Sequence, residues 1–191
     1  YPGASRWVAE SDGRLAGVGT VGRIYMYAPD FDAYWATLAV SLETRRRGVG
    51  SALLERLRDE ALRAGKIALH IPVSERRPDG IDFLEHRGFV EYERSKAVSL
   101  DLRGLTPPDV APPDGIAIVS LADRPDAVDQ VHAVAVAAFG DIPGGERPID
   151  PGDFAEFRAR DVDRPGIPPE AFMLALDGGT GSVVGYAALL L

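Results

Sequence analysis

An apolar run, a glycine-containing turn and an amphipathic segment follow one another in the first half of the chain. Residues 34–40 are almost continuously apolar, which predicts a strand covered on both faces. In residues 51–64, leucine and alanine recur every three or four positions, which predicts a helix that Gly65 ends. A strand that leads through a tight turn into a helix commits this part of the chain to a mixed α/β sheet.

Residues 45–50, with the sequence RRRGVG, form the turn between that strand and that helix. The first backbone N–H groups of a helix lack an intrahelical partner, and the helix dipole is positive there. Gly48 and Gly50 let the backbone approach a phosphate closely, and the arginines add bidentate donors. The turn therefore predicts a phosphate or pyrophosphate site, with a solvated basic turn as the alternative. The Gly-Lys-Ser/Thr end of a nucleotide P-loop and the third glycine of a dinucleotide fingerprint are missing.

Local signals predict the neighbouring elements as well. A Ser-Asp-Gly-Arg stretch between two apolar runs indicates a hairpin, and Asp79 and Gly88 are the expected N-cap and terminator of a short helix. The further elements expected before residue 103 are strands at 6–10, 15–21 and 67–71, a helix at 79–87, and one or two strands within 89–102.

Residues 105–115 contain two Pro-Pro pairs and a closing Asp-Gly, which predicts an extended linker. The charge changes at the same place, because residues 1–104 carry sixteen basic and fifteen acidic side chains, whereas residues 105–191 carry five and fourteen. Such asymmetry often accompanies a domain boundary. We therefore expect two modules, residues 1–104 and 116–191.

The second module is expected to contain a strand at 116–121, a helix from Asp123 to about residue 139, a loop at 141–152, a short helix near 154–160 and a closing hairpin. Residues 8–19 and 174–187 share an apolar residue followed by alanine, an Asp-Gly turn and a glycine-containing apolar strand. Two unrelated hairpins with a glycine turn could look alike. If the repeat is real, the chain holds the back part of one module and the front part of another.

Composition excludes several classes of function. The chain has no cysteine, and with only three histidines we expect no metal centre. A net charge of −8 argues against nucleic-acid binding, and no apolar run is long enough to span a membrane. No signal segment opens the chain, so we expect a cytoplasmic protein. Two lysines among 21 basic residues and no asparagine are typical of a high-GC bacterial genome.

Residues 38–54 (LAVSLETRRRGVGSALL) and 83–89 (FLEHRGF) resemble the GNAT (Gcn5-related) N-acetyltransferases, and the likeness extends over about residues 6–102. The RPDG sequence at 77–80 is similar to that of tandem GNAT proteins. The resemblance implies an α/β fold with a mixed, mostly antiparallel sheet flanked by helices, in two partial modules. It also implies acetyl-CoA as co-substrate, with its pantetheine arm paired to the buried strand and its pyrophosphate on the turn. The residues so assigned to the cofactor are Leu38, Ala39, Val40, Arg45, Arg46, Arg47, Gly48, Val49, Gly50 and Ser51.

The sequence departs from this family at the position of its general acid. Leu84 stands where a tyrosine commonly protonates the departing thiolate, and leucine cannot transfer a proton. Glu43 and Tyr92 are the remaining candidate catalytic residues, although a base could also come from a neighbouring element or through water. The three histidines, residues 70, 86 and 132, are predicted to be structural.

Two functions follow from these observations. The first is an acyl-CoA-dependent N-acyltransferase that moves an acetyl group directly to a primary amine of a small molecule or peptide, since no cysteine is present to carry it. The acidic second module favours a cationic amine. The alternative is a catalytically degenerate acyl-CoA-binding or scaffold module. The two partial modules could also complement each other as a permuted fold, within one chain or between swapped chains of a homodimer.

Overall fold

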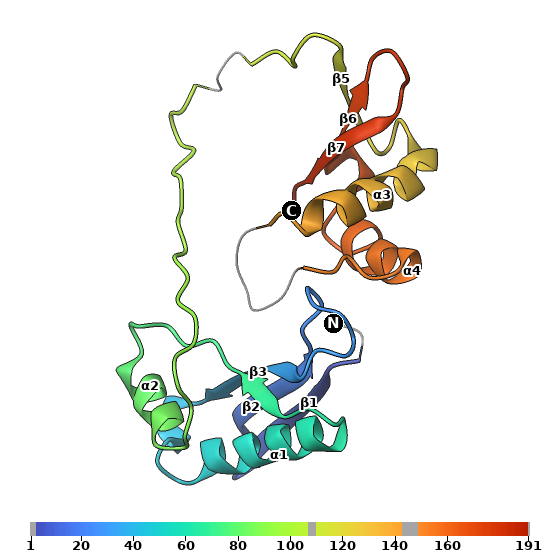
Figure 1. The fold of residues 1–191 in the computed structure, drawn as a ribbon. Helices are drawn as coiled ribbons and strands as arrows, with labels where there is room; N and C mark the ends of the chain where they lie inside the picture. The colour runs from blue at the N-terminus through green and yellow to red at the C-terminus, as the bar shows by residue number, and fades with distance from the viewer. Residues whose placement is uncertain (1–2, 107–109, 143–148, 191) are drawn as a thin grey trace. The chain divides into compact units, whose positions relative to one another are not determined.

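The computed structural model describes residues 3–106, 110–142 and 149–190. It divides the chain into two units, Tyr1–Arg94 and Ser95–Leu191, which are described separately below (Figure 1). Residues 107–109 of the predicted linker and residues 143–148 of the predicted loop lie outside the described residues.

The first unit contains a four-stranded sheet in the order β1 (Ser5–Ser11), β2 (Arg14–Arg23), β3 (Ala33–Val40) and β4 (Ala68–His70). The β1/β2 and β2/β3 pairs are antiparallel, whereas β3 and β4 pair in parallel. Asp12 and Gly13 both have positive φ angles, of 52° and 71°, as a two-residue hairpin turn requires. The predicted hairpin and the predicted mixed, mostly antiparallel sheet are therefore confirmed.

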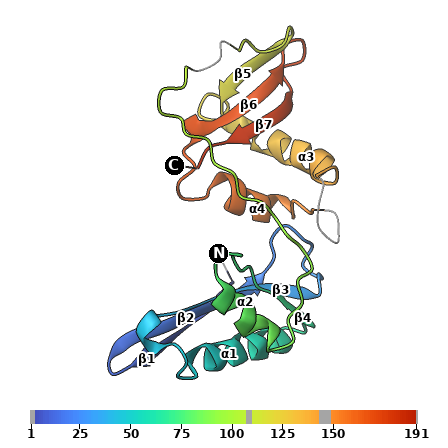
Figure 2. The same ribbon diagram turned by 90° about the vertical axis from the view of Figure 1, so that its left-hand side faces the viewer.

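Helix α1 (Val49–Arg63) covers one face of this sheet (Figures 1 and 2). The side chain of Leu57 is fully buried against Val21 and Ala36, and a Cβ on Gly19 would lie only 3.2 Å from Leu57 Cδ2. Glycine in β2 therefore lets the helix pack directly on the strand. Among the described residues, the prediction that β3 is covered on both faces is wrong, because alternate residues such as Trp35 are exposed.

A short 3₁₀ turn, η1 (Leu42–Thr44), follows β3, and helix α2 (Pro78–Glu85) follows β4. Helix α2 has Arg77 as its N-cap, with Pro78 in the first turn. The prediction that Asp79 is the N-cap is therefore wrong. Its side chain accepts hydrogen bonds from two arginines instead. Gly88, with φ of 84°, follows the helix as predicted.

Residues 89–102 form no strand, which contradicts the sequence prediction. The apolar residues Val98, Leu100 and Leu102 alternate as in a strand, but no neighbouring strand of the described residues pairs with their backbone. The side chain of Val98 is 93% exposed, and Leu100 and Leu102 are also exposed. Because a strand needs a partner for its backbone groups, the alternating pattern alone does not produce one.

The second unit pairs β5 (Ile116–Ser120), β6 (Phe172–Asp177) and β7 (Val183–Ala188) in an antiparallel sheet. Helices α3 (Val128–Phe139) and α4 (Phe154–Phe157) lie on one face of it (Figures 1 and 2). The shorter turns of this unit are η2 (Pro125–Ala127), the π-helical η3 (Arg158–Val162) and η4 (Pro169–Ala171).

Two polar side chains of this unit have local structural roles. The helix predicted to start at Asp123 begins later in the chain, and the Asp123 carboxylate accepts hydrogen bonds from the N–H and hydroxyl of Ser120 at 3.1 and 2.6 Å. His132 packs against Phe154 and Phe157, and its Nε2 lies 3.0 Å from the carbonyl oxygen of Gly152. The structural role predicted for His132 is therefore confirmed.

The two hairpins share an irregularity. In the first, Ala9 pairs with Gly17 and the register shifts at the next residue. In the second, Ala175 pairs with Gly185 and the register again shifts at the next residue. These are the residues that the repeat aligns with each other. A β-bulge is a specific feature of a hairpin and not a random defect. A bulge at the aligned position in both hairpins therefore supports a real repeat.

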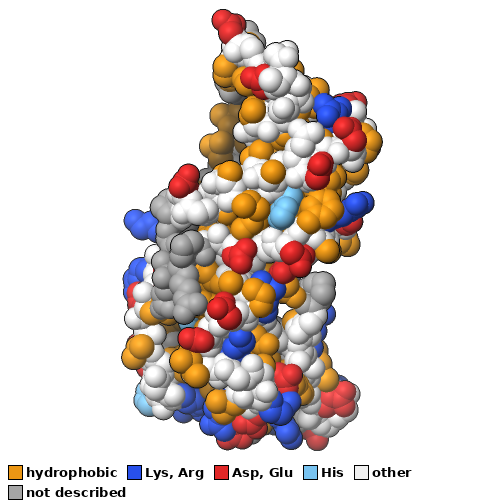
Figure 3. All heavy atoms as spheres, turned by 45° about the vertical axis from the view of Figure 1, so that its right-hand side comes forward, with side chains coloured by type: hydrophobic (Ala, Val, Ile, Leu, Met, Phe, Trp, Pro, Cys, Tyr) orange, Lys and Arg blue, Asp and Glu red, His pale blue; other side chains and the backbone are white. Residues whose placement is uncertain are grey.

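The surface of the molecule mixes residue types. On the face shown in Figure 3, apolar, acidic and basic side chains are interspersed. In the part of the chain that the structure describes, no helix is long and apolar enough to cross a membrane.

Candidate functional site

The backbone groups of β3 alternate between its two neighbours. The N–H of Ser41 donates to the carbonyl oxygen of Ala16 at 2.9 Å, and Ala39 pairs with Val18 in the same register. In an antiparallel ladder only every second residue bonds to a given neighbour. Ala39 is therefore bonded to β2, whereas the backbone groups of Leu38 and Val40 point to the opposite edge of the strand.

That opposite edge is open over half of β3. The parallel pairing with β4 covers three residue pairs and ends where Trp35 meets His70. Beyond Trp35, no strand of the described residues lies against the edge that Leu38 and Val40 present. Of the three predicted cofactor residues in β3, Leu38 and Val40 therefore lie at a free sheet edge. The backbone groups of Ala39 are bonded to β2 instead.

The turn after β3 is bonded to the sheet through Thr44. Its Oγ1 donates to the carbonyl oxygen of Ala16 at 3.0 Å and lies 2.7 Å from the hydroxyl of Ser41. This link fixes where α1 begins relative to β3. The sequence analysis missed Thr44, and only its place in a short polar turn could have indicated it.

Helix α1 begins with unpaired backbone donors. Gly48 is its N-cap in the left-handed conformation, and no side chain caps the helix. The first intrahelical bond runs from the N–H of Ala52 to the carbonyl of Gly48 at 3.0 Å. The N–H groups of Val49, Gly50 and Ser51 therefore have no intrahelical acceptor. No described atom lies within 4 Å of a Cβ position on Gly48, so the space above it is open.

The three arginines of the turn differ in their surroundings. Arg45 is partly buried, and its Nε donates to the carbonyl of Val40 at 3.4 Å while its Nη1 donates to Asp79 at 2.7 Å. Arg46 and Arg47 are exposed and form no ion pair with the described residues. Arg46 has a positive φ of 61°, which turns the chain into the helix. Two guanidinium groups are thus available to an anion, and the third has internal partners.

Asp79 receives hydrogen bonds from two sides. Arg77 donates to it through Nε and Nη2, at 3.2 and 3.4 Å, and Arg45 donates from the turn. The hydrogen bond from Arg77 is the largest influence that lowers the pKa of the Asp79 carboxyl, and the charge of Arg45 adds to it. The carboxylate is therefore charged at neutral pH.

Helix α2 packs against the first turn of α1. A Cβ on Gly50 would lie 3.2 Å from Cε2 of Phe83, so this glycine makes room for a ring. Arg87 lies over the same ring at 3.7 Å from its centroid and donates to the hydroxyl of Ser51 at 2.7 Å. The sequence analysis missed Arg87, although its spacing of four residues from Phe83 was the available signal.

The candidate catalytic residues lie apart. Tyr92 places its hydroxyl 2.8 Å from Nδ1 of His70, at the residue where the pairing of β3 and β4 ends. Glu43 is exposed in η1, after the other end of β3. The five residue-to-residue steps from Trp35 to Val40 span about 16 Å of strand, so the structure does not bring the two candidates together. Leu84 is only 8% exposed.

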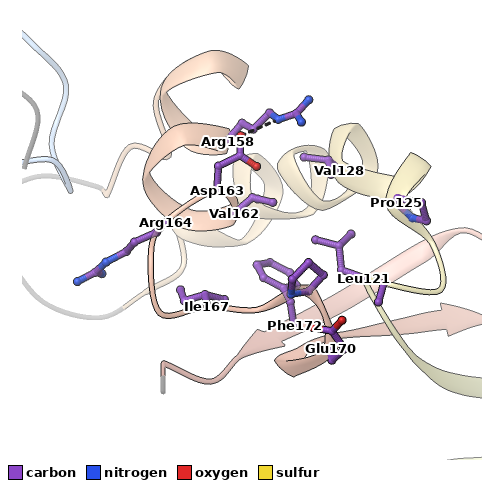
Figure 4. A pocket seen from close by; sticks show the side chains of 12 residues that line it. Leu121, Pro125, Val128, Arg158, Val162, Asp163, Arg164, Ile167, Glu170 and Phe172 are labelled. Carbon is purple, nitrogen blue, oxygen red and sulfur yellow. Dashed lines mark hydrogen bonds and ion pairs between the residues drawn. The ribbon is translucent and has the colours of Figure 1, made fainter.

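The second unit has a cavity of its own (Figure 4). Its volume is about 600 Å³, and its apolar lining includes Leu121, Val128 and Phe172. At the side of the cavity, Arg158 and Asp163 form an ion pair of 3.0 Å. None of the predicted site residues lines this cavity. Among the described residues, no group of three histidine or acidic side chains could hold a metal ion.

Comparison with known proteins gives a family match for part of the chain. Residues 1–89 match the acetyltransferase (GNAT) family. No curated protein matches the sequence.

The solved structures that match this chain include two aminoglycoside acetyltransferases and an integron cassette protein. The aminoglycoside acetyltransferase AAC(6')-Iy, solved with a CoA bisubstrate analogue, is 18% identical, with 53% of this chain and 71% of that chain covered and a TM-score of 0.45. The aminoglycoside acetyltransferase meta-AAC0020 from an uncultured soil metagenomic sample is 16% identical, with 54% and 68% covered and a TM-score of 0.45. An integron cassette protein from the mobile metagenome of V. cholerae is 20% identical, with 53% and 64% covered and a TM-score of 0.44.

The family match covers the hairpin, the open strand, the arginine turn, α1 and α2. The match to the acetyltransferase (GNAT) family therefore applies to residues 1–89, which are less than half of the 191-residue chain.

Proposed function

We propose that the first unit binds acetyl-CoA and transfers its acetyl group directly to a primary amine. The observation that carries this proposal is the free edge of β3, which leads straight into the unpaired N–H groups at the start of α1. The amides of a pantetheine arm pair with the backbone of Leu38 and Val40, as an added strand would. The pyrophosphate then meets the first turn of α1, with Arg46 and Arg47 as additional donors.

The reaction uses the same open edge. The amine nitrogen attacks the thioester carbonyl, and a backbone N–H on the free edge of β3 stabilises the oxyanion of the tetrahedral intermediate. The carbon–sulfur bond then breaks and the acetyl group remains on nitrogen. Because the chain has no cysteine, we propose transfer without a cysteine-bound intermediate.

The departing thiolate needs a proton, and we assign this to Tyr92. Its hydroxyl contacts His70 at the end of β4, where the open edge of β3 begins. A pantetheine arm that starts at the arginine turn and follows β3 runs toward this place. Glu43 lies beyond the opposite end of β3 from Tyr92, so it does not reach the same thioester carbonyl, and we propose that the proton of the amine leaves to water.

The acceptor amine is proposed to be cationic, on a small molecule or a peptide. The support is the excess of acidic side chains in residues 105–191, which attracts cations by long-range electrostatics. The proposed site of action is the cytoplasm. We propose no role for nucleic acid or metal, and a homodimer of the chain stays a prediction.

Calorimetric titration of the full chain with acetyl-CoA tests the proposal. Gly48→Glu places a carboxylate in the open space where the pyrophosphate would lie, and we expect it to abolish binding. Gly65→Glu is the matched control, because Gly65 also has a positive φ, of 74°, no described atom near its Cβ position, and lies just after the other end of α1. We expect the control to bind as the unchanged protein does. Failure of the unchanged protein to bind acetyl-CoA would overturn the proposal.

The second candidate function is an acyl-CoA-binding scaffold without turnover. The observation that favours it is Leu84, which is buried and has no proton to give. Release of CoA from acetyl-CoA with a panel of cationic amines separates the two. Steady release excludes the scaffold, whereas tight binding without release with every amine favours it.

A further inference from the structure

Arg45 lies across the entrance to the proposed cofactor groove. Its Nε donates to the carbonyl of Val40, which is one of the edge groups that the pantetheine arm would use. Its Nη1 donates to the carboxylate of Asp79 on α2, 34 residues further along the chain. The side chain of Arg45 is 32% exposed and that of Asp79 is 51% exposed, so Arg45 is the more buried member of this ion pair. Arg45 therefore binds the carbonyl that the pantetheine arm would use, and its guanidinium group is paired with the carboxylate of Asp79.

Asp79 has the properties of an internal substitute for a phosphate. It is a planar anion that two guanidinium groups hold, one from the turn and one from the N-cap of α2. Guanidinium groups bind carboxylates and phosphates through the same fork of donors. A diphosphate at the start of α1 would therefore compete with Asp79 for Arg45.

We propose that the ion pair of Asp79 and Arg45 is a latch on the cofactor groove, which the diphosphate of CoA opens by taking Arg45 from Asp79. This inference rests on the proposed function. Release of Arg45 frees the carbonyl of Val40 for the pantetheine arm. Asp79 keeps its two hydrogen bonds to Arg77, so the open state leaves no carboxylate without a cationic partner. When the latch opens, Arg45 therefore exchanges the carboxylate of Asp79 for the diphosphate of CoA.

A purely structural role for Asp79 predicts the opposite result. An acidic residue in the first turn of a helix stabilises that helix through the dipole. If this were its only role, loss of the charge would loosen α2 and weaken CoA binding. The latch predicts tighter binding instead.

The test compares Asp79→Asn with Asp82→Asn in the full chain. Asp82 is exposed on the same helix, and its side chain forms no ion pair with the described residues, so the control removes the same charge. We expect Asp79→Asn to lower the Kd for CoA about three- to five-fold in calorimetry, the range of an exposed ion pair. We expect Asp82→Asn to leave the Kd unchanged. An equal or weaker affinity of Asp79→Asn, compared with Asp82→Asn, would overturn the latch.

A second variant keeps the test decisive if Asp79→Asn fails to fold. Arg77→Gln removes the cation that supports Asp79 in the open state, so we expect the Kd for CoA to rise about three-fold. An unchanged or lower Kd in Arg77→Gln contradicts the latch. Absence of CoA binding by the unchanged protein would instead contradict the proposed function. Normal binding by the unchanged protein, with no effect of either variant, contradicts the latch alone.

Discussion

Gly50 of α1 and Phe83 of α2 are in contact, because a Cβ added to Gly50 would lie 3.2 Å from Cε2 of the ring. The second glycine of the arginine turn thus makes room for a helix, whereas Gly48 is the glycine with open space beside it. The sequence analysis assigned both glycines to phosphate binding. In the structure, Gly48 has open space beside it, whereas Gly50 makes room for the Phe83 ring.

This contact gives the first prediction. Gly50→Val would place a Cβ and two methyl groups against the Phe83 ring, and we expect a loss of about 1–3 kcal/mol in the free energy of unfolding, measured with urea. Adding Phe83→Leu to Gly50→Val should recover part of that loss, because a smaller side chain leaves space. Full stability of Gly50→Val would show that α2 does not pack on this turn.

The second prediction concerns the two exposed arginines. Replacing both Arg46 and Arg47 with glutamine should raise the Kd for CoA at least about ten-fold, since each can donate a charge-assisted hydrogen bond to phosphate. The dependence of the Kd on salt should also become weaker. Arg56→Gln, at an exposed position on the helix that follows the turn, is the control and should leave the Kd unchanged. An equal rise in the Kd for CoA in the control and in the double variant would indicate that CoA is attracted by positive charge in general and not by these two arginines.

The third prediction concerns Tyr92. Tyr92→Phe removes the hydroxyl that contacts His70, and we expect kcat to fall about 100-fold, the contribution of a general acid. The Kd for CoA should stay unchanged. An unchanged kcat in Tyr92→Phe would assign the proton to another donor.

The fourth prediction concerns the turn between β6 and β7. The N–H of Thr180 is the main group that lowers the pKa of Asp177, helped by the Thr180 hydroxyl and the N–H of Gly179. A lowered carboxyl pKa adds stability that is complete above the unfolded pKa, about 4, and is lost as the pH falls through the folded pKa. Asp177→Ala should therefore lower the Tm at pH 7 and have a smaller effect near pH 2. A pH-independent change in Tm would contradict this origin.

Local signals predicted the parts of the fold that depend on near neighbours. The Asp12-Gly13 turn, the apolar strand and the helix ended by Gly65 each follow from a few adjacent residues, and all three are present. The GNAT resemblance rested on the same stretch and is confirmed for residues 1–89.

Features that depend on distant partners could not be predicted in this way. Asp79 has the sequence position of a helix cap, but its hydrogen bond to Arg45 comes from 34 residues away. Gly50 fits a phosphate-binding turn, but its neighbour Phe83 is set by the packing of α2. One or two strands were predicted within residues 89–102, but no strand of the described residues pairs with this segment. In each case the outcome depended on which residues the fold brings together.

The exposed segment with Val98, Leu100 and Leu102 has a consequence for the behaviour of the protein in concentrated solution. An apolar side chain at every second position, on a backbone without a partner strand, is the pattern that stacks into fibrils between molecules. One ion pair, between Arg94 and Glu91, precedes the segment, and a second, between Arg103 and Asp101, includes a residue between Leu100 and Leu102. Charges beside an apolar stretch oppose such stacking, so we expect neutralising these side chains to lower the colloidal stability of the protein.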